Sequence, residues 1–162
     1  KPKDILCDVE WNTIFFFIGL FIIIGGLEAT GGIALMAKWI LAVTKGSQEA
    51  TAMIILWASG FISGVIDNIP YTATMAPLID QVQHVIPYAG SGHNPMWWAL
   101  SLGACLGGNF TLIGAAANVL VSETATAKGY PISFMRFLKY GALTTFISLI
   151  ICYVYLYFKY LT

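Results

Sequence analysis

The chain has 162 residues, of which 58% are hydrophobic and 10% are charged, and its formal net charge is zero. Soluble domains have about 45–50% apolar and about 25% charged residues, so this composition and a mean hydropathy of +0.78 favour a protein that lies in lipid. The neutral charge balance gives no electrostatic reason to expect a nucleic-acid partner. The chain starts without a methionine, and we expect it to be a piece of a longer protein.

The region at residues 1–49 predicts one membrane crossing followed by a helix in the membrane interface. No charged residue occurs in residues 11–27, a length within the roughly 17–25 residues that span a bilayer. The apolar stretch at residues 33–44 is too short to cross. Because Lys38 and Trp39 border its apolar face, we expect this helix to lie along the interface, where such side chains anchor well.

Residues 50–82 predict a re-entrant helical hairpin. An apolar run reaches Ile66, the sequence DNIP at residues 67–70 interrupts it, and a second apolar run follows. Proline has no backbone N–H and biases the residue before it away from helical geometry. We therefore expect two half-helices that meet at a polar tip, the second starting after Pro70 and ending near Asp80. Such irregular backbone survives in a bilayer where protein buries it or where it lines a cavity.

The region at residues 95–128 predicts a broken transmembrane helix. Its apolar run weakens at the glycine-rich residues 107–109, and we expect a second half-helix to start around Ala115. A final transmembrane helix is predicted over residues 133–160. Together these elements describe an all-α membrane protein.

Two interrupted apolar segments indicate the substrate site of a secondary transporter. The N-terminus of a half-helix presents free N–H groups and the positive end of a dipole, which suit an anion, whereas the carbonyls at a C-terminus suit Na⁺. Side chains from both interruptions would complete the substrate and ion site. They are Asp67, Asn68, Thr72 and Thr74 from the hairpin, and Asn109, Thr111 and Asn118 from the broken helix.

Asp67 has the strongest functional signal of these residues. An acid within a membrane is costly and is a functional candidate by default, so Asp67 could bind a cation or carry the proton of an exchange cycle. Alternatively, it caps the half-helix that follows, as aspartate does at many helix starts. For Asn68, Asn109 and Asn118, the alternative to ligand contact is hydrogen bonding that stabilises the tips.

The sequence gives no pattern typical of an enzyme. It has no nucleophile–base constellation and no phosphate loop, so we expect no catalytic residue, no metal and no cofactor apart from Na⁺ or H⁺ as a coupling ion. The cysteines and histidines lack metal-ligand spacing and are interpreted as packing and solvated residues, respectively. They are Cys7, Cys105, Cys152, His84 and His93.

The basic residues divide between the two sides of the predicted membrane protein. By the positive-inside rule, the larger group marks the cytoplasmic side, so the mouth of the hairpin faces outward. The larger group is Lys1, Lys3, Lys128, Arg136 and Lys139, and the smaller group is Lys38, Lys45 and Lys159. We expect a multi-pass protein of the plasma membrane.

Two long motifs resemble the ion transporter superfamily. They are DNIPYTATMAPLI at residues 67–79 and GACLGGNFTLIGAAANVLV at residues 103–121. Within the superfamily the chain resembles the branch of ArsB-type arsenite permeases, NhaD-type Na⁺/H⁺ antiporters and the melanosomal P protein. Residues 8–31 and 131–141 are similar to the P-protein members. The resemblance implies two inverted repeats, of which this chain would be the C-terminal one, an elevator-type fold, a homodimer and an N-terminal half as partner.

The resemblance also bears on the roles of the tip residues. In related dicarboxylate–sodium symporters, Ser-Asn-Thr signatures at the tips bind sodium and the substrate carboxylate. This chain has Asp67 where the serine is expected, and Asn68 and Thr72 are available for related roles. The acid favours coupling to a proton or another cation.

The leading hypothesis is a secondary active transporter that moves a small inorganic ion or an oxyanion such as arsenite, coupled to H⁺ or Na⁺. Cys105, one helical turn before Asn109, offers a thiol to arsenite. Three alternatives stay open: a Na⁺/H⁺ antiporter that uses Asp67, a Na⁺-coupled di- or tricarboxylate transporter, and a membrane scaffold that transports nothing.

Overall fold

The structure is a computed structural model that describes residues 11–86 and 94–161. Within these residues all regular secondary structure is helical, which agrees with the predicted all-α class. The expectations for Lys1, Lys3, Cys7 and His93 lie outside the described residues.

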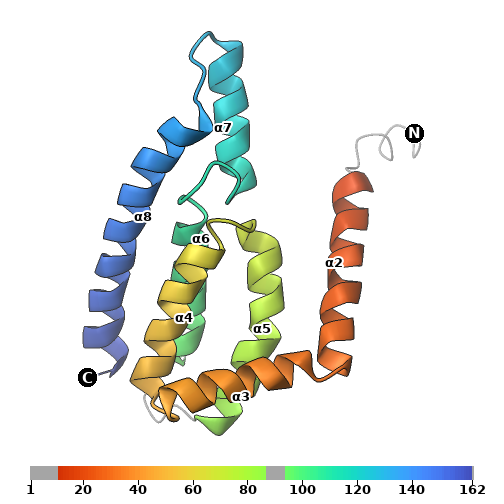
Figure 1. Ribbon diagram of the computed structural model, residues 1–162, viewed down its shortest axis with the longest axis vertical. Coiled ribbons are helices and arrows are strands. Elements are labelled where there is room, and N and C mark those ends of the chain that lie inside the picture. The colour runs from red at the N-terminus through yellow and green to blue at the C-terminus, as the bar shows by residue number, and fades with distance from the viewer. Residues whose placement is uncertain (1–10, 87–93, 162) are drawn as a thin grey trace, which may run out of the picture.

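Helices α2 (Trp11–Ala29) and α3 (Gly32–Thr44) form an L-shaped pair (Figure 1). The two axes differ by 66°. Gly31 at the corner has a φ of 77°, in the left-handed region that glycine adopts without strain. Ile33, Ala37 and Ile40 of α3 are buried against the protein, whereas the Met36 side chain is exposed.

Helices α4 (Gln48–Ile62) and α5 (Asn68–Val85) rise from α3 and return to it, with their connection near the middle of the molecule (Figure 1). Helix α6 (Pro95–Gly107) lies against both arms and packs most extensively on α4. Helix α7 (Ala116–Ala127) continues upward beyond a break, and α8 (Phe134–Leu156) descends along the outside. A π-helical turn, η1 (Tyr157–Leu161), ends the described chain.

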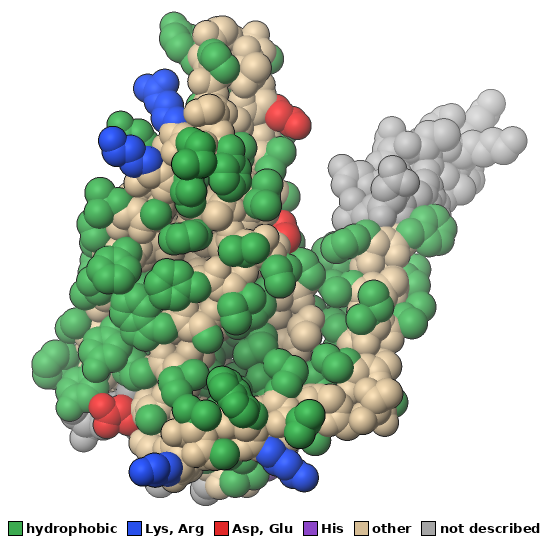
Figure 2. Space-filling view, in the orientation of Figure 1, with side chains coloured by type: hydrophobic (Ala, Val, Ile, Leu, Met, Phe, Trp, Pro, Cys, Tyr) green, Lys and Arg blue, Asp and Glu red, His purple; other side chains and the backbone are tan. Residues whose placement is uncertain are grey.

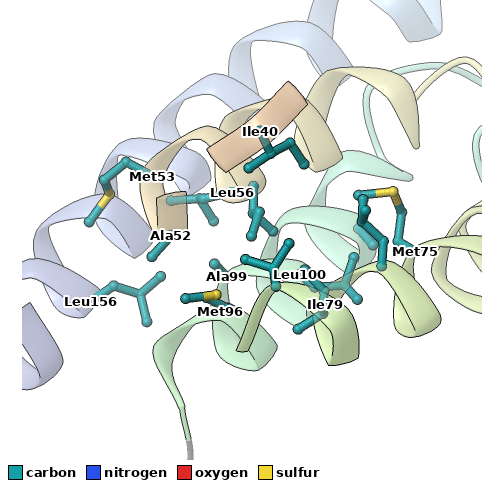
Figure 3. Close-up of a cluster of buried hydrophobic side chains, with 14 of the residues drawn as sticks. Ile40, Ala52, Met53, Leu56, Met75, Ile79, Met96, Ala99, Leu100 and Leu156 are labelled. Carbon is teal, nitrogen blue, oxygen red and sulfur yellow. The ribbon is translucent and has the colours of Figure 1, made fainter. Parts of the chain in front are cut away.

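The core lies where α3, α4, α5, α6 and α8 meet. Figure 3 shows Leu56, Ile79 and Leu100 from three of these helices converging, with Ile40 above them. The helices α4 and α6 approach so closely because glycine occupies their contact. A Cβ added to Gly103 would lie 2.5 Å from the Leu56 carbonyl oxygen. Small residues permit this approach between apolar helices.

One continuous stretch of the described residues, Phe134–Tyr160, has the length and hydropathy to cross a membrane alone. It has 27 residues and a hydropathy of 1.8. The pair formed by Ile14–Ala29 and Gly32–Thr44 passes the same test only when its two bent parts are taken together. Large apolar side chains of α2 and α8 are widely exposed, including Phe15, Ile22 and Ile151.

The basic side chains lie toward opposite ends of the molecule. Lys38 is on α3 and Lys45 caps it, whereas Arg136 and Lys139 lie on the first turns of α8, at the other end (Figures 1 and 2). Hydrophobic side chains cover much of the face between these ends in Figure 2. This distribution matches the division of charge that the sequence predicts for these four residues.

The structure corrects the predicted helix limits around the hairpin. The first arm ends at Ile62 rather than Ile66, and the second starts at Asn68 instead of after Pro70. Pro70 is the third residue of α5, where an N–H would have no partner within the helix, so proline is tolerated there. The second arm also extends past Asp80 to Val85. His84 therefore lies on an exposed surface of this helix, with its Nε2 atom 3.9 Å from Oδ2 of Asp80.

Candidate functional site

The connection between α4 and α5 forms the first tip, residues 63–67. Asp67, its last residue, caps the helix α5 that follows, because the Asp67 side chain accepts a hydrogen bond from the Ile69 N–H at 3.0 Å. The Asp67 carbonyl accepts another from Tyr71. Asp67 is partly exposed. Asp67 thus has the capping role that the sequence offered as an alternative, and one of its two carboxylate oxygens makes this contact.

The second tip, residues 108–115, connects α6 to α7. It differs from the first because no side chain caps the start of α7 at Ala115. Instead Asn118, in the first turn of α7, donates from Nδ2 to the carbonyls of Gly108 at 2.9 Å and Thr111 at 3.1 Å. The Asn118 amide therefore holds the connecting loop against the helix, and the N-terminal end of α7 keeps its positive dipole without a compensating acid.

The two tips contact each other at the centre of the molecule. The Asn68 N–H donates to the Gly114 carbonyl at 3.2 Å, and the buried Thr111 hydroxyl donates to the Gly64 carbonyl. A Cβ added to Gly114 would lie 2.6 Å from the Gly108 oxygen and 3.0 Å from the Gly64 oxygen. Figure 1 shows the two connections side by side between the arms and α7. We call this region the tip crossing.

The predicted site residues differ in their place relative to the tip crossing. Asn68 reaches it with its side chain, because a Cβ on Gly108 would lie 3.2 Å from the Asn68 Nδ2. Thr72 and Thr74 donate to carbonyls four residues back in α5, at 2.7 and 2.9 Å. Their oxygen lone pairs remain able to accept or to bind a cation.

Asn109 has an exposed side chain. Among the described residues, no hydrogen bond joins the side chains of Asn109 or Thr74 to the opposite tip. The structure therefore brings Asn68, Thr111 and Asn118 to the tip crossing, whereas Asn109 and Thr74 lie around it.

Sequence reasoning missed two buried hydroxyl contacts that hold the hairpin arms. Ser63 donates to the Ala104 carbonyl of α6 at 2.6 Å, and Tyr71 donates to the Ser59 hydroxyl at 3.1 Å. The spacing of four between Ser59 and Ser63 was the available signal, since residues four apart lie on the same helical face.

A cavity of about 750 Å³ opens between α7 and α8, beside the second tip. Its lining includes Asn109, Tyr130, Arg136, Tyr140, Gly141 and Thr144. A second space, of about 490 Å³ and with an apolar lining, lies between α3 and the hairpin arms. Within residues 11–86 and 94–161, no group of three or more histidine, cysteine or acidic side chains could hold a metal ion.

The arrangement at the tip crossing suits the binding of a small ion. The start of α7 has no side-chain cap and presents free N–H groups. At the start of α5, by contrast, the N–H groups of Asn68 and Ile69 already donate to Gly114 and Asp67. The carbonyls of Gly64 and Gly114 lie in the same region. Both signs of partial charge are therefore available within one short stretch. An anion and a cation can both find partners there.

Residues 1–103 match the protein family CitMHS, whose description reads "Citrate transporter". An uncharacterized transporter of Mycobacterium tuberculosis is 46% identical over 158 residues, which cover 98% of this chain and 37% of the relative. An uncharacterized transporter of Synechocystis sp. is 39% identical over 162 residues, with 91% of this chain and 36% of the relative covered. The P protein of Homo sapiens is 40% identical over 142 residues, with 85% and 17% covered. The chain thus spans just over a third of the length of the two bacterial relatives, and no solved structure gives a significant match.

Proposed function

The chain belongs to the CitMHS citrate transporter family, and we propose that it is the C-terminal half of a secondary active transporter that binds a small anion and a coupling cation at the tip crossing. The main observation that supports this proposal is the direct contact of the two tips through the hydrogen bonds Asn68–Gly114 and Thr111–Gly64. This contact joins two interrupted helices into one potential site at mid-height in the molecule.

The anion would bind at the uncapped N-terminus of α7, with the Asn68 amide as a neighbouring donor. A carboxylate is the first substrate class to test, because the family that matches is described as a citrate transporter. An inorganic oxyanion such as arsenite is the second. Cys105 supports it, since this free thiol is exposed on the last turns of α6 before Asn109.

The coupling ion would be H⁺ or Na⁺. Asp67 uses one carboxylate oxygen to cap α5, and within the described residues its other oxygen takes part in no hydrogen bond or ion pair. A cation or a proton can occupy that oxygen. The same observation favours the second candidate function, a Na⁺/H⁺ antiporter in which Asp67 is the exchanging acid.

The rest of the proposed assembly follows from the length of the relatives and from the resemblance to inverted-repeat transporters. The relatives have room for a second repeat, which would supply the N-terminal half. We propose that the two halves form an elevator-type transporter, that the complete protein is a homodimer and that it lies in the plasma membrane. A scaffold without transport would need neither tip.

The test uses the full-length protein in proteoliposomes with imposed H⁺ or Na⁺ gradients, first without substrate and then with citrate or arsenite. Coupled anion transport predicts charge movement that requires an added anion. Antiport predicts a response to the cation gradients alone that Asp67→Asn abolishes. The control is Asp80→Asn, which removes an exposed acid of the same helix that bonds to Gln83. The proposal fails if no combination of gradient and anion gives a response.

A further inference from the structure

The cavity between α7 and α8 borders the second tip, where Asn109 is part of its lining. At its inner end, α8 presses on the second tip, since a Cβ added to Gly141 would lie 2.5 Å from the Asn109 carbonyl oxygen and 2.8 Å from that of Phe110. Arg136 lines the cavity five residues earlier on the same helix. With a rise of about 1.5 Å per residue, it lies about 7.5 Å from Gly141 along the axis.

The lining of the cavity carries one kind of charge. Arg136 contributes a guanidinium, and no acidic side chain lines the space. Among the described residues, no carboxylate forms an ion pair with Arg136. Asn109, Tyr130 and Tyr140 add an amide and two phenol groups. The cavity thus has a mostly apolar wall that carries one cation and several neutral hydrogen-bond donors, and a predicted site residue, Asn109, is part of that wall.

We propose that this cavity is an anion vestibule, in which Arg136 captures a carboxylate or another multivalent oxyanion and delivers it to Asn109 at the second tip. The guanidinium fork matches the two oxygens of a carboxylate or phosphate group. The volume is within the roughly 300–1,000 Å³ of ligand pockets. This inference rests on the proposed function, because it supplies the entry route and the charge preference of the same site.

With such a vestibule, the preference for anionic solutes depends in part on α8, which is not one of the interrupted helices. A multivalent anion is attracted by the positive cavity before it reaches the helix N-terminus, and a neutral solute is not. The proposed occupant is a soluble anion in transit. A lipid phosphate at the membrane surface has the same chemistry, so the experiment must separate the two sources.

The test follows the reaction of N-ethylmaleimide with Tyr140→Cys in the full-length protein, with the other cysteines replaced by alanine and nanodiscs opening both faces to the buffer. Tyr140 lies one helical turn from Arg136 and lines the same cavity. Citrate and inorganic phosphate are the probes. We expect saturating citrate to slow labelling several-fold, and we expect Arg136→Gln to remove this protection. Lys139→Gln is the matched control, because it removes an exposed cation of α8 that does not line the cavity.

The labelling experiment tests the inference even if the protein shows no measurable transport. The inference is overturned if the cysteine does not react, if neither anion protects it, or if protection survives in Arg136→Gln. A lipid headgroup is the occupant, and the inference is wrong, if labelling is slow only in nanodiscs with anionic lipid and soluble anions have no effect. Where citrate transport is measurable, Arg136→Gln should raise KM about tenfold and leave kcat within about twofold.

Discussion

Each of the two tips connects a pair of helices, but different contacts hold the two tips in place. The first tip is short, and the Asp67 side chain caps the helix that follows it. The second tip is longer, its helix has no side-chain cap, and it depends on Asn118 and on the hydrogen bonds Thr111–Gly64 and Asn68–Gly114 across the tip crossing. The first is therefore determined largely by its own sequence, whereas the second needs a partner 40 to 50 residues away, as the Thr111–Gly64 separation of 47 shows. The open N-terminus of the second tip is the better place for a ligand.

The largest effect should come from crowding the tip crossing. Gly114→Ala places a methyl group 2.6 Å from the Gly108 oxygen of the same tip and 3.0 Å from the Gly64 oxygen of the first tip. Because backbone atoms line the space, relaxation must distort the second tip and shift it away from the first. We expect a loss of about 1–3 kcal/mol in the free energy of unfolding and transport reduced about tenfold or more. Thermal denaturation and uptake by the full-length protein measure the two effects.

The matched control for this substitution is Gly26→Ala in α2, where a Cβ meets nothing within 4 Å. Alanine is favoured over glycine in a helix by about 0.5–1 kcal/mol, so stability should stay the same or rise. If Gly114→Ala were as stable and active as the native protein, neither the second tip nor its contact with the first would be tightly packed.

The next effect should come from Asn118→Ala, which removes both hydrogen bonds that hold the second tip. Leaving two carbonyls without these partners should lower stability by about 1–3 kcal/mol. Thr124→Ala is the control, since the exposed Thr124 hydroxyl bonds only within its own helix, to the Leu120 carbonyl. If the two substitutions lower the melting temperature equally, the account is contradicted.

Substitutions of Thr111 should have a smaller effect on stability. They separate the contribution of the hydroxyl group from that of the side chain's shape. Thr111→Val removes the hydrogen bond to the Gly64 carbonyl and keeps the branched side chain, so we expect a loss of about 1–2 kcal/mol. Thr111→Ser keeps the donor and should retain most of the stability. If serine is the less stable variant in denaturation experiments, packing and not hydrogen bonding joins the tips at this point.

The smallest effect on stability should be at Asp67. Asparagine keeps an acceptor for the Ile69 N–H, and it is as good an N-cap as aspartate, whereas alanine should cost about 1 kcal/mol. Asp67→Asn should therefore melt close to the native protein even where it changes coupling. A large loss of stability in Asp67→Asn would instead assign a structural role to the charge.

The sequence predicts the helical class, the positions of both interruptions to within a few residues and the polar residues around them. It misplaces the start of α5, because proline is tolerated in the first turn of a helix, where an N–H would have no partner within the helix, and Pro70 lies there. The contacts of Gly64, Gly108 and Gly114 could not be predicted, since no local pattern specifies which distant backbone fills the space that a glycine leaves. The same holds for the cavity at Arg136, which depends on how α8 packs against the second tip. The binding roles of the seven candidate residues stay predictions.

The most direct test of a shared site is the stabilisation of the full-length protein by citrate, measured as a shift in melting temperature across a concentration series. Asn68→Ala removes a side chain that reaches the tip crossing from the start of α5, Asn109→Ala alters the second tip, and Gln83→Ala serves as a control outside both tips. If the tips form one site, each asparagine variant should weaken citrate binding and the control should not. Undiminished binding in either variant, or no stabilisation by citrate, arsenite or phosphate in the native protein, would contradict the account.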